Sequence, residues 1–82
     1  MGSKVFASAI GWSSVTPSDS TSVTCKAIYV GTGGNIALAP SSSGSATTFS
    51  NVGSGTILPV ELKDGRIMST NTTATNIIAL NW

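Results

Sequence analysis

The chain has no histidine and only one cysteine, and both shortages exclude kinds of chemistry. Without histidine it lacks the commonest general base and the commonest metal ligand of proteins. With a single cysteine it cannot form a disulfide within the chain, and it has none of the paired cysteines that mark zinc sites. We therefore expect no enzyme activity, no catalytic residue, no cofactor and no metal site.

Charged residues are also scarce. Four Lys or Arg and three Asp or Glu make up 9% of the 82 residues, against about 25% in a typical soluble domain. Because the net charge is +1 and the sequence has no basic cluster, we expect no nucleic-acid partner and no binding to an anionic membrane. No apolar run approaches the roughly 20 residues that span a bilayer. Only Val5–Phe6 separates Lys4 from Ala7, whereas a signal peptide needs an apolar region of about 7–15 residues.

Hydroxyl side chains are abundant instead, with 14 Ser and 11 Thr. A chain of this length forms one domain, in which ordering costs of roughly 1.5 kcal/mol per residue nearly cancel the hydrophobic gain. No disulfide or metal is expected to supply the difference. We therefore expect the protein to gain stability by association, as a homo-oligomer.

The pattern of the sequence predicts an all-β fold. Apolar residues show almost no helical periodicity, and Gly, Ser, Asn or Pro interrupts the chain every 8–12 residues, which is typical of sandwiches and barrels. We expect a small antiparallel β-sandwich of about six to eight short strands. The intervening turns are short, so we expect strands that follow each other in the sequence to pair as a meander.

Two segments give the clearest turn signals. Gly31–Gly34 is expected to join two strands of a hairpin, and Asp64–Gly65 is expected to form a two-residue hairpin turn. Pro59 cannot donate a backbone hydrogen bond, so it is expected at an edge or a bulge. Within one domain, we expect residues 1–24 to form an N-terminal arm with a first short strand, and residues 25–82 to form the sandwich.

Several residues could carry chemistry, but each has a simpler interpretation. The glycines of Gly31–Gly34 lack the spacing of a phosphate-binding loop. The carboxylates of Glu61 and Asp64 could act as an acid–base pair, yet they are interleaved with Lys63 and Arg66, a pattern typical of solvated charge that keeps a sheet edge soluble. We expect Cys25, at the start of a strand, to be a buried small hydrophobe rather than a reactive thiol.

Aromatic residues near the two ends of the chain are the best candidates for an interface. Trp12 and Trp82 could anchor a partner, because tryptophan offers a large rigid ring with one polar tip. Phe6 and Ile10 are expected to contribute to the same interface, either with a partner or between copies. Two alternatives remain: both tryptophans could cover the ends of the sandwich, or one could stack on a carbohydrate.

The sequence also resembles a family of head-surface proteins, namely the head spike base and capsid decoration (cement) proteins of tailed phages and gene transfer agents. The similarity runs in order through about residues 15–82. The segments that carry it are Val15–Thr21, Lys26–Ile36, Thr48–Val52, Gly55–Val60 and Thr72–Leu80.

This resemblance implies a non-enzymatic virion structural protein bound to the exterior of the capsid. Such a protein either cements the shell or forms the base of a vertex spike that anchors a head fibre. Its implied partners are the major capsid protein and its own copies in a symmetric trimer or pentamer. It would be made in the cytoplasm of a bacterial host and reside on the capsid surface. The alternative from the residues alone is a β-sandwich module that binds a glycan or a host surface.

Overall fold

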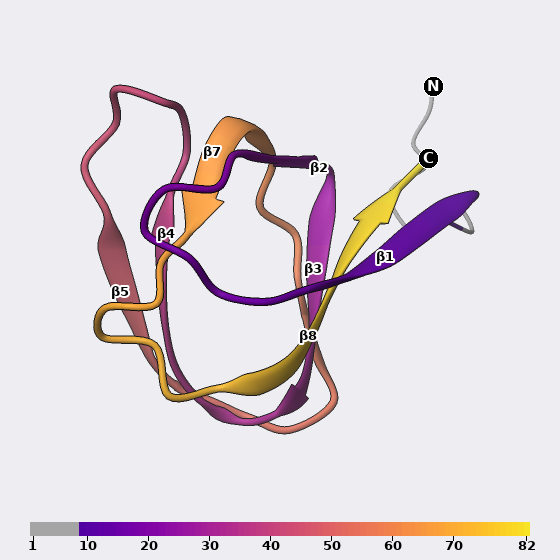
Figure 1. Cartoon of the computed structure of the whole chain (residues 1–82). Helices are drawn as coiled ribbons and strands as arrows, with labels where there is room; N and C mark the ends of the chain where they lie inside the picture. Colours follow the sequence, from indigo (N-terminus) through magenta and orange to yellow (C-terminus); the bar gives the residue numbers. More distant parts are fainter. Residues whose placement is uncertain (1–8) are drawn as a thin grey trace.

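Two four-stranded antiparallel sheets face each other in the computed structural model, which describes residues 9–82 (Figure 1). One sheet has the order β1-β8-β3-β6 and the other has the order β2-β7-β4-β5. The described residues contain no helix. The strands are β1 (Gly11–Val15), β2 (Val23–Cys25), β3 (Ala27–Thr32), β4 (Gly34–Ala39), β5 (Thr47–Val52), β6 (Thr56–Leu58), β7 (Leu62–Ile67) and β8 (Thr75–Asn81).

The core lies between the two sheets and consists of small and branched aliphatic side chains. β-Branched residues favour strands because their side chains pack well on a pleated surface. Burying each Ile or Leu contributes roughly 1.5–3 kcal/mol. The buried cluster consists of Cys25, Ile28, Val30, Ile36, Leu38, Leu62, Ile67, Ala74, Ile77 and Ala79.

The predicted all-β sandwich is confirmed, with eight strands in two sheets. The meander is wrong, because β4 and β5 are the one pair of consecutive strands among residues 9–82 that lie side by side in a sheet. At Gly31–Gly34 the chain passes from β3 in one sheet to β4 in the other, so no hairpin forms there. Gly33 is required at this crossing, since a Cβ atom there would collide with the carbonyl oxygen of Val52.

The hairpin predicted at Asp64–Gly65 is also wrong, because both residues lie inside β7. The pairing of β2 with β7 shifts register between Val23 and Cys25, where β7 contains one extra residue. Asp64 has a φ of 52°, so the left-handed conformation that could have made a turn makes a β-bulge instead. Pro59 directly follows the edge strand β6, as its missing N–H predicts.

Residues 11–25 contribute a strand to each sheet and cross between them. β1 pairs with β8, the chain then passes over to the second sheet, and β2 pairs with β7. Asp19 fastens this crossing: its carboxylate accepts hydrogen bonds from the N–H groups of Ser69 and Thr70, at 2.9 and 3.0 Å, and from the Thr70 hydroxyl at 2.6 Å. These bonds, led by the Thr70 hydroxyl, lower the pKa of Asp19 from 3.8 to about 2.

Candidate interaction surface

The outer face of the sheet β1-β8-β3-β6 is apolar. Residues directly opposite each other on antiparallel strands point to the same face. One row on this face crosses three strands and consists of Trp12 in β1, Leu80 opposite it in β8, and Ala27 opposite Leu80 in β3. The next row contains Ser14, Ile78, Tyr29 and Ile57.

Ile10 and Trp82 extend this face at one end. Ile10 directly precedes β1 and Trp82 directly follows β8, so both lie beside the first row, where β1 begins and β8 ends. A hydrogen bond of 2.8 Å from the Ile10 N–H to the Asn81 carbonyl holds Ile10 next to the end of β8. We call Ile10, Trp12, Ile57, Ile78, Leu80 and Trp82 the apolar face.

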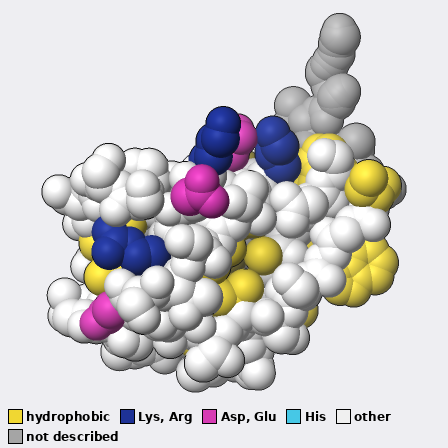
Figure 2. Space-filling view, turned by 45° about the horizontal axis from the view of Figure 1, so that its top comes forward, with side chains coloured by type: hydrophobic (Ala, Val, Ile, Leu, Met, Phe, Trp, Pro, Cys, Tyr) yellow, Lys and Arg dark blue, Asp and Glu magenta, His cyan; other side chains and the backbone are white. Residues whose placement is uncertain are grey.

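Large parts of the apolar face are open to solvent. The side chains of Ile10 and Trp12 are 83% and 68% exposed, and those of Ile57 and Trp82 are 43% and 37% exposed. Figure 2 shows hydrophobic side chains gathered on the side where Figure 1 places the start of β1 and the end of β8. An antiparallel sheet with one solvated face normally carries polar residues there, so this face has the character of an interaction surface.

The structure brings together three of the four residues expected at an interface. Ile10, Trp12 and Trp82 lie at one end of the apolar face, and Phe6 lies outside the described residues. Trp12 is 68% exposed, and its row on the sheet faces away from the core. An interface role for these residues remains a prediction, now with a defined surface.

The sequence reasoning missed Ile57, Ile78 and Leu80. One signal for them was present: Ile77–Leu80 is apolar at every position, and such a run indicates a strand with two apolar faces. The side of this strand that faces water could not be assigned without the register between strands.

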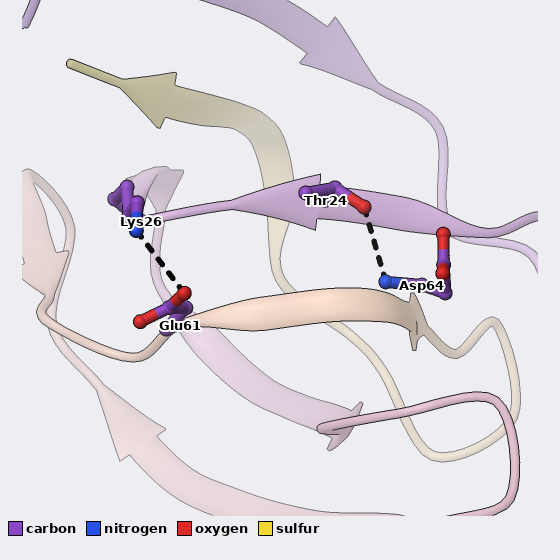
Figure 3. A network of polar contacts seen from close by, with 4 residues as sticks. All are labelled: Thr24, Lys26, Glu61 and Asp64. Atoms are coloured by element: carbon purple, nitrogen blue, oxygen red, sulfur yellow. Dashed lines mark hydrogen bonds and ion pairs between the residues drawn. The ribbon is translucent and has the colours of Figure 1, made fainter.

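Charged side chains lie elsewhere on the molecule. Within residues 9–82 they occur only in the segments 19–26 and 61–66. Lys26 and Glu61 form an exposed ion pair of 3.2 Å, and the N–H of Asp64 donates a 3.0 Å hydrogen bond to the Thr24 hydroxyl (Figure 3). An exposed pair of this kind contributes about 0–1 kcal/mol. Glu61 is therefore paired with a cation in a solvated cluster, which fits the interpretation as surface charge.

The outer face of the second sheet has a different character, because Arg66 stands there opposite Ala39. Its guanidinium Nη2 donates to the Gly44 carbonyl at 3.2 Å, and its Nη1 donates to the Asp19 carbonyl at 3.5 Å. These bonds hold the segments that contain Gly44 and Asp19 against this sheet. Of the two outer faces, the one on β1-β8-β3-β6 is thus the uncharged one.

No protein-family model and no curated protein matches the chain. A solved structure does match: a chain of the structure described as "Capsid of native GTA particle computed with C5 symmetry", GTA being a gene transfer agent. The two chains are 33% identical, the match covers 98% of this chain and 92% of that one, and the TM-score is 0.79. The chain belongs to the same family as that chain of the gene transfer agent capsid structure. The resemblance to capsid-associated proteins of gene transfer agents is therefore confirmed at the level of the family.

A carbohydrate site would combine hydroxyl-lined hollows with a tryptophan that stacks on the sugar, and in this structure the two lie apart. Two hollows of about 490 and 550 Å³ flank residues 14–16 and are lined mainly by Ser and Thr. Trp12 and Trp82 line neither of them. No tryptophan is thus placed to stack on a sugar held by these hydroxyl groups.

Cys25 is buried, as predicted, with 1% of its surface exposed. Burial raises the pKa of its thiol, which keeps the thiol protonated and unreactive. Residues 9–82 contain no group of three or more His, Cys, Asp or Glu side chains placed to hold a metal ion. A search of the same residues finds no helix long and apolar enough to cross a membrane.

Proposed function

We propose that this protein is a non-enzymatic structural component bound to the outside of a phage or gene transfer agent capsid, and that the apolar face binds the shell. The observation that carries the proposal is this face: a sheet with large apolar side chains on its solvent side, in a member of a capsid protein family. The scarcity of charge near the face supports it, because charged groups are costly to desolvate in a close contact.

The size of the apolar face favours attachment by many copies. The exposed parts of its four most exposed side chains, from totals of up to about 250 Å² for a tryptophan and somewhat less for an isoleucine, add up to roughly 500 Å². A standard protein interface buries about 800 Å² on each partner, so one face gives a weak contact. Copies joined in a symmetric ring bind the major capsid protein much more tightly, because the contacts after the first one become intramolecular.

The order of this ring distinguishes the two capsid roles. The capsid in the related structure was computed with C5 symmetry, a symmetry of the whole particle that a pentamer at a fivefold vertex would share. A pentamer fits a fivefold vertex and favours a head spike base, on which a head fibre docks, over a cement protein. In either role the protein is made in the cytoplasm of the bacterial host and ends on the capsid surface.

The test is the number of copies of this chain per purified particle, measured by quantitative mass spectrometry against the major capsid protein. Copies in the tens per particle are expected for a vertex spike base. A ratio near one per capsid subunit, or one per few, would replace the spike base by a cement protein. Absence from purified particles would contradict a capsid role altogether.

A further inference from the structure

Each sheet of the sandwich has one long free edge strand and one short one. The short edges are β2 and β6, of three residues each, and Pro59 follows β6. The long edges are β1, of five residues, and β5, of six, and within residues 9–82 no strand pairs with their outer sides. Monomeric proteins block such edges with charge, proline or short length. β1 and β5 contain neither charge nor proline, so within the described part of the chain both are open to another strand.

Hydrogen bonds of β4 show which groups of β5 point outward. The N–H of Ala37 donates to Thr72 Oγ1 and its carbonyl accepts from the N–H of Met68, both at 2.9 Å, so both groups of Ala37 point away from β5. In an antiparallel pair of strands, two opposed residues point their backbone N–H and C=O groups either toward each other or, in both strands, away from the partner strand. Thr48 lies opposite Ala37, so its N–H and C=O point to the free edge.

The same reasoning applies to β1. The carbonyl of Leu80 accepts a 2.9 Å hydrogen bond from the Lys26 N–H, on the side of β3. Trp12 lies opposite Leu80, so its N–H and C=O point away from β8. Ser14, two residues further along, points in the same direction. Among residues 9–82, each long edge therefore offers a row of donors and acceptors that no other strand pairs with.

The two open edges lie on opposite sides of the molecule. β1 and β2 line one hollow together, which places them on the same side, and the sheet orders then place β5 on the other side. Figure 1 shows β1 and β5 on opposite sides of the sandwich. A bulge at Asn51, with a φ of 57°, limits the regular part of β5 to about four residues, close to the length of β1.

We propose that β5 of one copy pairs with β1 of the next copy, so that the chain assembles head to tail through its backbone. A contact between two different edges repeats from copy to copy and closes into a ring when the rotation allows. A contact between two β5 strands would stop at a dimer and leave β1 open. This inference rests on the proposed function, since the pairing of β5 with β1 is the contact that would join neighbouring copies of the capsid-bound ring.

The test uses the purified full chain without capsid, and native mass spectrometry measures its assembly. The wild type is expected to form a ring of more than two copies. Thr48→Pro and Ser14→Pro each remove one outward N–H while leaving the ladders inside the chain intact, so each variant alone is expected to be monomeric. Ser42→Pro, in the exposed turn from Ser41 to Gly44, is the matched control and is expected to form the ring.

A mixture of the two variants gives the sharpest result. Thr48→Pro keeps an intact β1 and Ser14→Pro keeps an intact β5. In the mixture, β5 of a Ser14→Pro copy can pair with β1 of a Thr48→Pro copy, and no other edge contact is possible. The mixture is therefore expected to yield a one-to-one dimer and nothing larger. Assembly of either variant alone beyond a monomer, or a monomeric wild type, would overturn the proposal. Circular dichroism checks that each variant is folded. If a proline variant is unfolded, Thr48→Lys or Ser14→Lys takes its place, and the expected outcomes are the same.

The outcome separates this inference from the proposed function. Particles are absent from the assembly measurement, so a failure of the ring overturns the joint between β5 and β1 and leaves the capsid role standing. Conversely, absence of the chain from purified particles would contradict the capsid role while the ring still forms.

Discussion

Replacing Trp12 by alanine should release the protein from the capsid without unfolding it. A tryptophan can bury up to about 250 Å², and this side chain is 68% exposed, which leaves about 170 Å² for a partner to cover. At about 25 cal/mol per Å², full coverage is worth about 4 kcal/mol, and coverage of half is worth about 2 kcal/mol. Since 1.4 kcal/mol is a factor of ten, each copy should bind at least about 30-fold more weakly.

The assay compares the occupancy of wild-type and Trp12→Ala protein on purified particles, together with thermal unfolding of the free protein. Trp12→Phe is the matched control: it keeps most of the apolar ring and should retain most of the occupancy. The stability of the free protein should change by no more than about 0.5 kcal/mol, because the lost side chain faces solvent. Unchanged occupancy of Trp12→Ala would refute the assignment of the apolar face as the capsid-binding surface.

Three further predictions concern the fold. The pKa of Asp19 is about 2 in the folded protein, against an ordinary value of 3.8, so the stability that its carboxylate contributes is complete above about pH 4 and is lost as the pH falls to 2. In urea unfolding, the wild type should therefore lose its stability advantage over Asp19→Asn between these two pH values. A difference that does not change with pH would contradict this. Gly65→Ala should destabilise by about 1–3 kcal/mol in urea unfolding, because its Cβ meets the backbone carbonyl of Ala39, whereas Gly11→Ala, with nothing within 4 Å, should be neutral. Cys25 should react with a thiol reagent only at the rate of unfolding, and fast labelling of the folded protein would show that the thiol is accessible.

The sequence was sufficient for the class of fold. Turn residues at short intervals and the lack of helical periodicity reflect local backbone preferences, and together they favour short strands over helices. The burial of Cys25 also followed from the residue type and its place at the start of a strand. The resemblance to a capsid protein family was readable because it depends on the order of residues along the chain.

The pairing of strands was not readable from the same signals. Asp64–Gly65 favours a left-handed backbone, and that conformation serves a hairpin turn and a β-bulge equally well. Gly31–Gly34 permits a sharp change of direction, and the chain uses it to cross between sheets. In both cases the partner strand, which is distant in the sequence, decides the outcome.

The candidate site divides in the same way. Composition and position alone marked Ile10, Trp12 and Trp82 as interface candidates. Their assembly into one face with Ile57 and Ile78 depended on the register of β1, β8, β3 and β6, because alternation along a strand defines two faces without saying which of them meets the other sheet. The open edges of β1 and β5 likewise exist only because long-range pairing placed these strands at the ends of their sheets. Local sequence thus determined the elements and their chemistry, and tertiary pairing decided which surfaces remain exposed for a partner.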